Sequence, residues 1–236
     1  MSVAVVVVAA GAGARLGAAE PKAFVPLAGS PIVRWAMDQA LACPDVDRVI
    51  VMVPGELVAR AQGLIGDRER HRVQVVPGGA ERANSVRRGL AHLTEHDGVV
   101  LVHDAARCLT PPSLFSDVVR AIRAGHGAVV PGLAVADTIK EVDEAGKVVS
   151  TLDRSRLRAI QTPQGFVTEI LVHAHAEHQA RGHLGTPVTD DAGLVEASGA
   201  PVLVIPGHPL AEKITTARDL LVAEATVAAL PDRPLP

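Results

Sequence analysis

Aromatic residues and an excess of charge of either sign are both missing from this chain. Aromatics make up 2% of the 236 residues, tyrosine is absent, and 23 lysines and arginines nearly balance 26 aspartates and glutamates. A protein that binds nucleic acid would be expected to carry stacking rings or a basic excess. The composition therefore argues against a nucleic-acid partner.

Disulfide frameworks and membrane segments are excluded as well. Cys43 and Cys108 are the only cysteines, and they give neither a disulfide pattern nor the spacing of a metal finger. No apolar run approaches a membrane span in length, and the opening run lacks the basic leader of a signal peptide. We therefore expect a cytoplasmic protein in reducing surroundings, with no membrane partner.

What the chain does contain is a series of short β-branched runs without alternation or charge, beginning with Val3–Val8 and Val49–Val53. Such runs are typical of parallel strands that are buried on both faces. Further strands are predicted at 73–76, 98–102, 128–130 and 201–205, and helices at 32–43, 56–65, 113–125, 168–181 and 189–198. This order predicts a single α/β domain over residues 1–236 with a doubly wound, mostly parallel, Rossmann-like sheet.

The alternation of strand and helix breaks at residues 137–158. Short strands are predicted there on either side of the turn Glu144–Gly146, and Asp153 with Arg154 is also assigned to a strand. An insert of this size carries no core of its own, so it must pack on the parent domain or on another subunit. We expect a β-arm that serves as a dimer contact.

The first strand runs into a loop with the sequence AAGAGARLG at residues 9–17, which is followed by Pro21 and Lys22. Glycine lets backbone N–H groups approach a ligand, and Arg15 and Lys22 add positive charge. Ligands of open α/β sheets bind beyond the carboxyl ends of such strands, so the loop predicts a polyphosphate site. A plain strand-to-helix turn would explain the glycines but not the two cations.

The loop fits neither of the common phosphate-binding motifs. The third glycine of a dinucleotide fingerprint is displaced to Gly17, and the Gly-Lys-Ser/Thr of a Walker loop is absent. Prolines also delay the next helix until about Pro31, which Ser30 is expected to cap. The loop is therefore predicted to be long enough to fold over a nucleotide.

Two further strand ends carry polar residues. Gly78 and Gly79 precede a predicted helix ending at Leu93, and Arg82 and Ser85 share one face of its first turn. These groups could recognise the edge of a base, although a βα turn with a capping serine is the simpler alternative.

Asp104 follows the strand at 98–102. A carboxylate placed there beside a polyphosphate suits Mg²⁺, which prefers few carboxylates together with phosphate oxygens and water. A local ion pair with Arg107 is the alternative.

Histidines and paired carboxylates near the C-terminal half give weaker signals. His173, His175 and His178 lie on a predicted helix where at most two of them converge, so we expect a solvated face. Thr189 is expected to cap the next helix. Asp190 and Asp191 are neighbours in sequence and are not expected to face one cavity.

Joining two anionic phosphates requires alignment and cations more than a nucleophile with its base. The chain offers Arg15, Lys22, Arg107 and Lys213, together with a metal on Asp104. The sequence therefore suits transfer from a nucleoside triphosphate to a phosphate acceptor.

Eight motifs, taken together and in order, resemble the 2-C-methyl-D-erythritol 4-phosphate cytidylyltransferase family over essentially the whole chain. They are AAGAGAR at 9–15, PK at 21–22, GGAERANSV at 78–86, HDAAR at 103–107, DTIK at 137–140, QTPQ at 161–164, TDDA at 189–192 and KIT at 213–215. The resemblance implies a Mg²⁺-dependent attack of methylerythritol phosphate on the α-phosphorus of CTP, in non-mevalonate isoprenoid synthesis, by a homodimer with its active site at the subunit interface.

The resemblance also implies roles for particular residues. Arg15 and Lys22 would stabilise the transition state, and Asp104 would hold the metal. CTP would be bound by Ala9, Ala10, Gly11, Ala12, Gly13, Gly79, Ala80, Arg82, Ser85 and Ala105. The sugar phosphate would be bound by Arg107, Thr162, Thr189 and Lys213, with Thr138 and Arg154 from the arm of the opposite subunit.

The chain departs from the family pattern at a few positions. Cys108 stands where proline is usual, Gly193 replaces a common serine, and Ala211-Glu212 replaces an asparagine followed by an apolar residue. If that asparagine assists the metal or the substrate, its role is unfilled or is taken in part by Glu212.

Three alternative functions stay open on sequence grounds. They are a ribitol 5-phosphate cytidylyltransferase, a nicotinamide-dependent dehydrogenase with an aberrant glycine loop, and an idle regulatory nucleotide binder. Pro54 stands where a dehydrogenase would want a ribose-binding acid, and the two loop cations argue against an idle binder.

Overall fold

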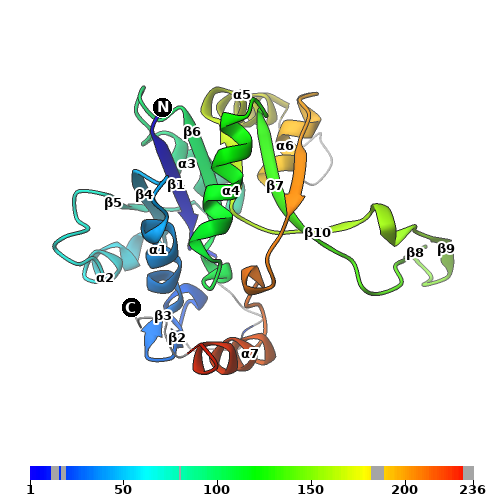
Figure 1. Ribbon diagram of the computed structural model, residues 1–236, viewed down its shortest axis with the longest axis horizontal. Coiled ribbons are helices and arrows are strands. Elements are labelled where there is room, and N and C mark those ends of the chain that lie inside the picture. The colour runs from blue at the N-terminus through cyan, green and yellow to red at the C-terminus, as the bar shows by residue number, and fades with distance from the viewer. Residues whose placement is uncertain (12–15, 17–19, 80, 182–188, 231–236) are drawn as a thin grey trace.

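A central sheet carries helices on both faces, and a narrow ribbon extends from one side of it (Figure 1). In this computed structural model the described residues are 1–11, 16, 20–79, 81–181 and 189–230. The eight strands of the sheet are β1 (Val3–Val8), β4 (Arg48–Val53), β5 (Val73–Pro77), β6 (Val99–Asp104), β7 (Ala128–Ala134), β10 (Arg158–Ile160), β11 (Gln164–Val167) and β12 (Leu203–Pro206). Their order is β10-β7-β11-β6-β1-β4-β5, and β12 pairs with β7.

The predicted parallel core of the sheet is confirmed. β1 lies between β4 and β6 and is parallel to both, and β4 is parallel to β5. The last residue of β1, Val8, is in register with Met52 of β4 and with Asp104 of β6. The carboxyl ends of these strands therefore meet at one edge, where the glycine loop begins.

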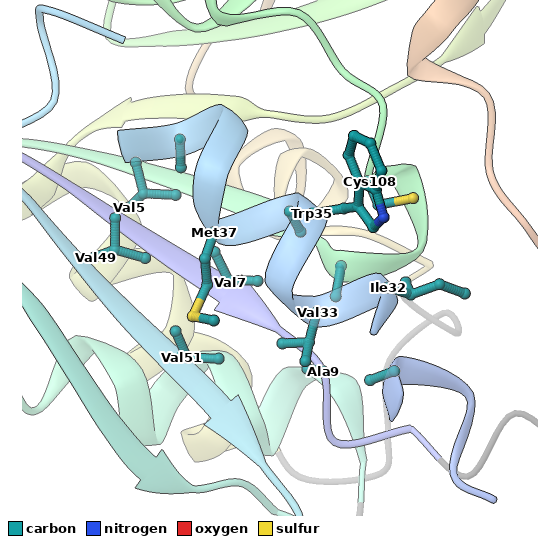
Figure 2. Packing of buried hydrophobic residues seen from close by; sticks show 14 of the residues in the cluster. Val5, Val7, Ala9, Ile32, Val33, Trp35, Met37, Val49, Val51 and Cys108 are labelled. Carbon is teal, nitrogen blue, oxygen red and sulfur yellow. The ribbon is translucent and has the colours of Figure 1, made fainter. Parts of the chain in front are cut away.

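Alternate side chains of β1 enter two separate cores. Val5 and Val7 pack with Val49 and Val51 of β4 against α1, which spans Ile32–Ala42 (Figure 2). Val6 faces the other side, into a core that includes residues of α3 (Arg82–Leu90), α5 (Thr168–Arg181) and α6 (Asp191–Ala197). Burial on both faces explains why the run has no polar alternation.

The remaining helices are α2 (Val58–Gln62), α4 (Pro112–Arg123) and α7 (Ala217–Ala228). Thr216 and Asp219 form the capping box predicted from their spacing at the start of α7. The predicted cap of α1 is wrong, because Ser30 and Pro31 form the short strand β3 with β2 (Pro26–Leu27), and α1 begins only at Ile32. Helix α2 is shorter than predicted because residues 55–57 form a 3-10 turn, and α3 ends at Leu90 instead of Leu93.

The composition of residues 161–165 predicts a turn, which is only partly correct because β11 begins at Gln164. This strand runs antiparallel between β6 and β7, so the sheet is mixed on the β7 side of β6. Its glutamine and glycine give it a turn-like composition, but both are buried between neighbouring strands. Tertiary context therefore overrides local preference here.

The strand predicted at 128–130 also extends further than expected, through Pro131 and Gly132 to Ala134. A proline in a strand cannot donate a backbone hydrogen bond, but its carbonyl can still accept one. The Pro131 carbonyl accepts a hydrogen bond from Gln161 N at 2.8 Å. Asp153 and Arg154, predicted as a strand, lie instead at the start of a 3-10 turn that Asp153 caps.

The predicted β-arm is a hairpin of β8 (Lys140–Val142) and β9 (Val148–Thr151) (Figure 1). It extends away from the body, and its apolar side chains Val142, Val148 and Val149 are 53%, 58% and 63% exposed. Such a two-stranded ribbon has no core of its own. Whether a second copy covers it stays a prediction.

Among the residues that the structure describes, no helix has the length and apolar character needed to cross a bilayer. Cys43 and Cys108 are both buried.

Gly165 provides a test of the β11 assignment. A Cβ atom there would lie 2.3 Å from Val118 Cγ1 of α4 and 2.9 Å from Leu101 Cδ2 of β6. We expect Gly165→Ala to lower the free energy of unfolding by about 1–3 kcal/mol, as overpacking does, in urea denaturation. Gly63→Ala is the control, since its Cβ would meet only ordinary contacts. Equal midpoints for the two variants would contradict this placement of β11.

Candidate active site

A pocket of about 150 Å³ lies where the carboxyl ends of β1 and β6 meet the start of α3. Its lining residues come from the end of β1 and the start of the glycine loop, a 3-10 turn at Lys22–Phe24, the segment before and within α3, the end of β6 with the residues that follow it, and the segment before α7. They are Val8, Ala9, Ala10, Gly11, Lys22, Ala23, Gly79, Glu81, Arg82, Ser85, Asp104, Ala105, Ala106 and Lys213.

Most residues that the sequence assigned to a nucleotide site are brought together here. The predicted residues among the lining are Ala9, Ala10, Gly11, Lys22, Gly79, Arg82, Ser85, Asp104, Ala105 and Lys213. Ala12, Gly13, Arg15 and Ala80 lie outside the described residues. The described lining includes three cations and two carboxylates, which suits an anionic ligand.

The glycine pair before α3 allows a close approach of backbone to backbone. A Cβ on Gly78 would lie 2.4 Å from Ala10 Cβ, so a side chain there would push the two loops apart. The buried Ser85 hydroxyl accepts a hydrogen bond from Gly79 N at 3.0 Å and lies 3.1 Å from the Glu81 carbonyl. In this structure Ser85 therefore orders the loop in which Gly79 faces the pocket.

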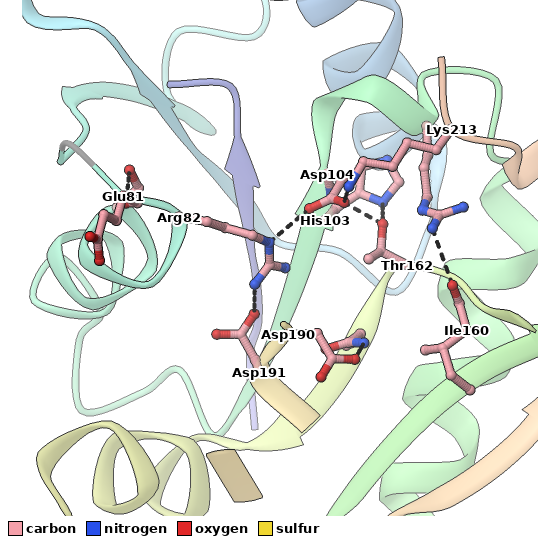
Figure 3. Close-up of polar contacts among 12 residues, drawn as sticks. Glu81, Arg82, His103, Asp104, Ile160, Thr162, Asp190, Asp191 and Lys213 are labelled. Carbon is pink, nitrogen blue, oxygen red and sulfur yellow. Dashed lines mark hydrogen bonds and ion pairs between the residues drawn. The ribbon is translucent and has the colours of Figure 1, made fainter. Parts of the chain in front are cut away.

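Asp104 binds two cations that come from distant parts of the chain (Figure 3). Arg82 Nε donates to its Oδ1 at 3.1 Å, and Lys213 Nζ donates to its Oδ2 at 2.7 Å. Burial alone would raise the pKa of Asp104, but Arg82 and Lys213 outweigh that effect and hold the pKa well below its usual range. Asp104 is therefore ionised throughout the physiological pH range.

Lys22 lies close to the same group of charges. Its Nζ donates to the backbone carbonyl of Ile214 at 2.8 Å, next to Lys213 in the sequence. Lys22 and Lys213 thus reach the pocket from two segments that are joined by this hydrogen bond from a side chain to a backbone carbonyl.

Arg107 does not form the alternative ion pair with Asp104. Its Nη1 and Nη2 donate to the carbonyls of Ala211 and Ile160 at 2.7 and 3.1 Å, and burial lowers its pKa. Thr162 lies behind Asp104, where its Oγ1 accepts from Asp104 N at 3.0 Å and is 3.0 Å from His103 Nδ1. Neither Arg107 nor Thr162 lines the pocket.

The predicted solvated histidine face of α5 is wrong at one position. His175 is 4% exposed, and its Nε2 lies 2.9 Å from Asp191 Oδ1. Asp191 Oδ2 in turn accepts from Arg82 Nη1 at 2.6 Å (Figure 3). A spacing of sixteen residues between His175 and Asp191 gives no helical periodicity, so no local signal could have found this pair.

The predicted cap of α6 is also wrong. Asp190, not Thr189, is the N-cap, and its side chain accepts from Gly193 N at 3.0 Å. Thr189 is exposed and does not line the pocket. As expected, Asp190 and Asp191 serve different partners.

Thr138 and Arg154 lie in the arm, and neither lines the pocket of its own chain. Arg154 donates instead to the backbone carbonyl of Ala136. Their assignment to a sugar-phosphate site depends on a second copy of the chain and stays a prediction.

The residues present fit a metal ion that is bound together with its substrate. In the described part of the chain, no three histidine, cysteine, aspartate or glutamate side chains gather into a metal site. Asp104 is an ionised carboxylate in the pocket lining. Mg²⁺ needs only one or two such groups when phosphate oxygens and water complete its shell.

The fold and the pocket together define a class. A doubly wound sheet with a cationic pocket at the carboxyl ends of its strands is typical of α/β proteins that bind phosphorylated ligands. No α-helix begins between Gly11 and Ile32 in the described residues, which is unlike the dinucleotide fold.

Comparison with known proteins identifies the family within this class. The family model "IspD: 2-C-methyl-D-erythritol 4-phosphate cytidylyltransferase" matches residues 3–229. A protein of that name from Nocardia farcinica is 54% identical over 223 residues, which cover 94% of this chain and 93% of the relative. The chain belongs to the 2-C-methyl-D-erythritol 4-phosphate cytidylyltransferase family.

Solved structures agree with this assignment. The enzyme of the same name from Thermus thermophilus superimposes with a TM-score of 0.77 at 34% identity, covering 97% of this chain and all of the other. A 4-diphosphocytidyl-2C-methyl-D-erythritol synthase from Anaerococcus prevotii gives a TM-score of 0.83 at 25% identity, with 96% of each chain covered. The dehydrogenase alternative is not supported.

The departures from the family pattern lie outside the main pocket. Cys108 is buried and Glu212 lines a separate small cavity with it, next to α7. Gly193 lies in the first turn of α6 and donates its N–H to the cap residue Asp190. None of the three lines the main pocket.

The buried His103 should make stability depend on pH. Burial lowers its pKa from 6.5 to about 4, so the unfolded chain binds a proton that the native protein rejects. The contribution of His103 to the free energy of unfolding is therefore fully present above pH 6.5. It is lost as the pH falls toward 4, and amounts to roughly 3 kcal/mol.

His103→Gln should flatten that part of the profile, as measured by urea unfolding between pH 4 and 7. The control is His126→Gln, because His126 is exposed. Parallel profiles for the wild type and His103→Gln would contradict the neutral buried state.

Proposed function

We propose that this protein joins CTP and 2-C-methyl-D-erythritol 4-phosphate to give CDP-methylerythritol and pyrophosphate, a step of non-mevalonate isoprenoid synthesis. An oxygen of the acceptor phosphate forms a bond to the α-phosphorus of CTP, and the bond from that phosphorus to the β-phosphate oxygen breaks. Pyrophosphate leaves with the electron pair. The observation that carries the proposal is the family's motif residues Lys22, Arg82, Asp104 and Lys213 converging in one pocket.

The first physical obstacle to this reaction is charge. A triphosphate and a phosphate monoester repel each other, and the charge on the transferred group shifts toward the leaving pyrophosphate. Lys22 and the loop residue Arg15 are assigned to that developing charge, where fixed cations act without reorganisation. The acceptor phosphate is already ionised near neutral pH, so no general base is required.

The nucleotide is assigned to the strand-end loops. The backbone of residues 9–13 would contact the triphosphate, since glycines expose N–H groups there. Cytosine is assigned to the segment of Gly79, Ala80 and Ser85. The Ser85 hydroxyl supports this role indirectly, by fixing the Gly79 backbone.

Asp104 is the residue that would hold Mg²⁺ with the triphosphate. When bound, the ion would neutralise phosphate charge and align the oxygens of the reacting group. Arg82 and Lys213 already contact this carboxylate, so they would lie beside the same phosphates.

The acceptor phosphate is assigned to Arg107, Thr162, Thr189 and Lys213, completed by Thr138 and Arg154 from the arm of a second copy. Three valines of the arm are more than half exposed, which favours a protein contact over solvent. The proposed enzyme is therefore a homodimer, and its cytoplasmic location also stays a prediction.

The choice of acceptor can be tested with a turnover screen that measures pyrophosphate release. We expect CTP with methylerythritol phosphate to exceed CTP with ribitol 5-phosphate by ~10-fold or more in kcat/KM, because an acceptor site rejects groups that leave its polar atoms unpaired. Faster turnover of ribitol 5-phosphate would assign the other cytidylyltransferase activity. Tight NADH binding without CTP binding would refute the proposal as a whole.

The shared active site can be tested by complementation between two defective variants. Lys22→Ala should lower kcat by ~10²-fold or more, and Arg154→Ala should raise KM for the acceptor more than KM for CTP. A heterodimer of the two contains one site in which both residues are intact. Heterodimers isolated by two different affinity tags should therefore show about half of the wild-type rate when they are assayed at an acceptor concentration well below the KM of Arg154→Ala.

Activity no higher than the mean of the two separate variants would contradict the cross-subunit arrangement. Lys147→Ala in the tip of the arm is the control for Arg154→Ala, since it removes a cation from the same exposed ribbon at a residue that is not assigned to the acceptor.

A further inference from the structure

A row of charged and polar groups runs from the pocket into the protein, beyond the residues given a role above. It leads from Lys213 through Asp104, Arg82 and Asp191 to His175, with successive contacts of 2.7, 3.1, 2.6 and 2.9 Å. The first three members line the pocket, and the last two are almost fully buried.

Arg82 is the point where the row leaves the pocket. Its Nε and Nη1 atoms are engaged by Asp104 and Asp191, which leaves Nη2 as a donor for a ligand. A guanidinium held at two corners has its plane and direction fixed. The orientation of Arg82 toward the nucleotide therefore depends on where Asp191 holds it.

Asp191 is fixed in turn by His175. Its side chain is 1% exposed, so a carboxylate oxygen that lost its partner could not turn to water. The oxygen Oδ1 is opposite His175 Nε2, and because a carboxylate only accepts, that nitrogen carries the proton. His175 thus keeps Oδ1 occupied and leaves Oδ2 alone for Arg82.

We propose that His175 is a positioning residue for the nucleotide site, which acts through Asp191 on Arg82. Without the histidine, both Asp191 oxygens become available to the guanidinium. The bidentate pairing that this permits would draw Arg82 toward Asp191 and away from Asp104. This inference rests on the proposed function and adds a residue of α5 that touches neither substrate.

A purely structural role is the competing explanation, since the His175–Asp191 contact also joins α5 to α6, which pack together. The two roles differ in what they change. A structural bond affects stability alone, whereas a positioning bond affects CTP and leaves the acceptor site unchanged. The kinetic constants for the two substrates therefore separate them.

The experiment uses the full-length protein and compares His175→Leu with His175→Gln. Leucine removes the donor at similar volume, and the glutamine amide can place an N–H near the position of Nε2. His173→Leu is the matched control, because it makes the same change on the same helix at an exposed histidine whose ion-pair partner is Glu177. Direct CTP affinity, both KM values, kcat and Tm are measured for each protein.

We expect His175→Leu to weaken CTP binding and raise KM for CTP about tenfold, with KM for the acceptor unchanged and His173→Leu like the wild type. His175→Gln should return KM for CTP to within about threefold of the wild-type value. In an Arg82→Ala background, His175→Leu should cause no further loss of CTP affinity, because the effect passes through Arg82.

An unchanged affinity for CTP in His175→Leu, whatever its Tm, would overturn the inference. Additive losses with Arg82→Ala, or equal rises in both KM values, would overturn it too. If His175→Leu fails to fold, His175→Ala, which also removes the donor, is measured alone and in the Arg82→Ala background to complete the same cycle. Failure of the wild type itself to bind CTP would refute the proposed function, which is a separate outcome.

Discussion

The carboxylate of Asp104 is the interaction on which the pocket depends. It attracts one cation from α3 and another from the segment before α7, two parts of the chain that lie far apart in sequence. Without that negative charge, Arg82 and Lys213 would repel each other across the pocket. The fold supplies the carboxylate at one place, the last residue of β6, in register with the last residue of β1.

This arrangement prepares the protein for an anionic ligand. The cations are desolvated in part before the ligand arrives, and a carboxylate keeps them in position meanwhile. A polyphosphate would give these cations additional hydrogen-bond acceptors. The side chains would not have to lose their whole hydration shell or reorient when the ligand binds. In a preorganised site of this kind, the free energy needed to desolvate the charges is spent when the protein folds. The buried network is tolerated only if its charged and polar groups are fully paired.

The sequence predicted the parallel part of the sheet well, because Val3–Val8 and its neighbours are buried on both faces and carry no competing signal. It missed β11, since Gln164 and Gly165 are typical of turns and only their neighbours make them a strand. It also missed the burial of His175, whose partner lies on another helix. For the site, the loops at 9–13 and 78–79 were evident from glycine, and Lys213 was counted among the candidate cations. Its direct contact with Asp104 could not be predicted, because the two residues lie 109 positions apart in the sequence.

The position of β11 has a consequence for how the chain is made. β6 becomes an inner strand only when residues 164–167 settle beside it, and these leave the ribosome long after β1, β4, β5 and β6 are complete. Until then the nascent sheet presents an unpaired apolar edge, the kind of surface that recruits other chains. The half of the molecule that carries the glycine loops thus depends on late-synthesised residues to avoid such contacts during translation, and shielding of this edge by a chaperone would be of most value in that interval.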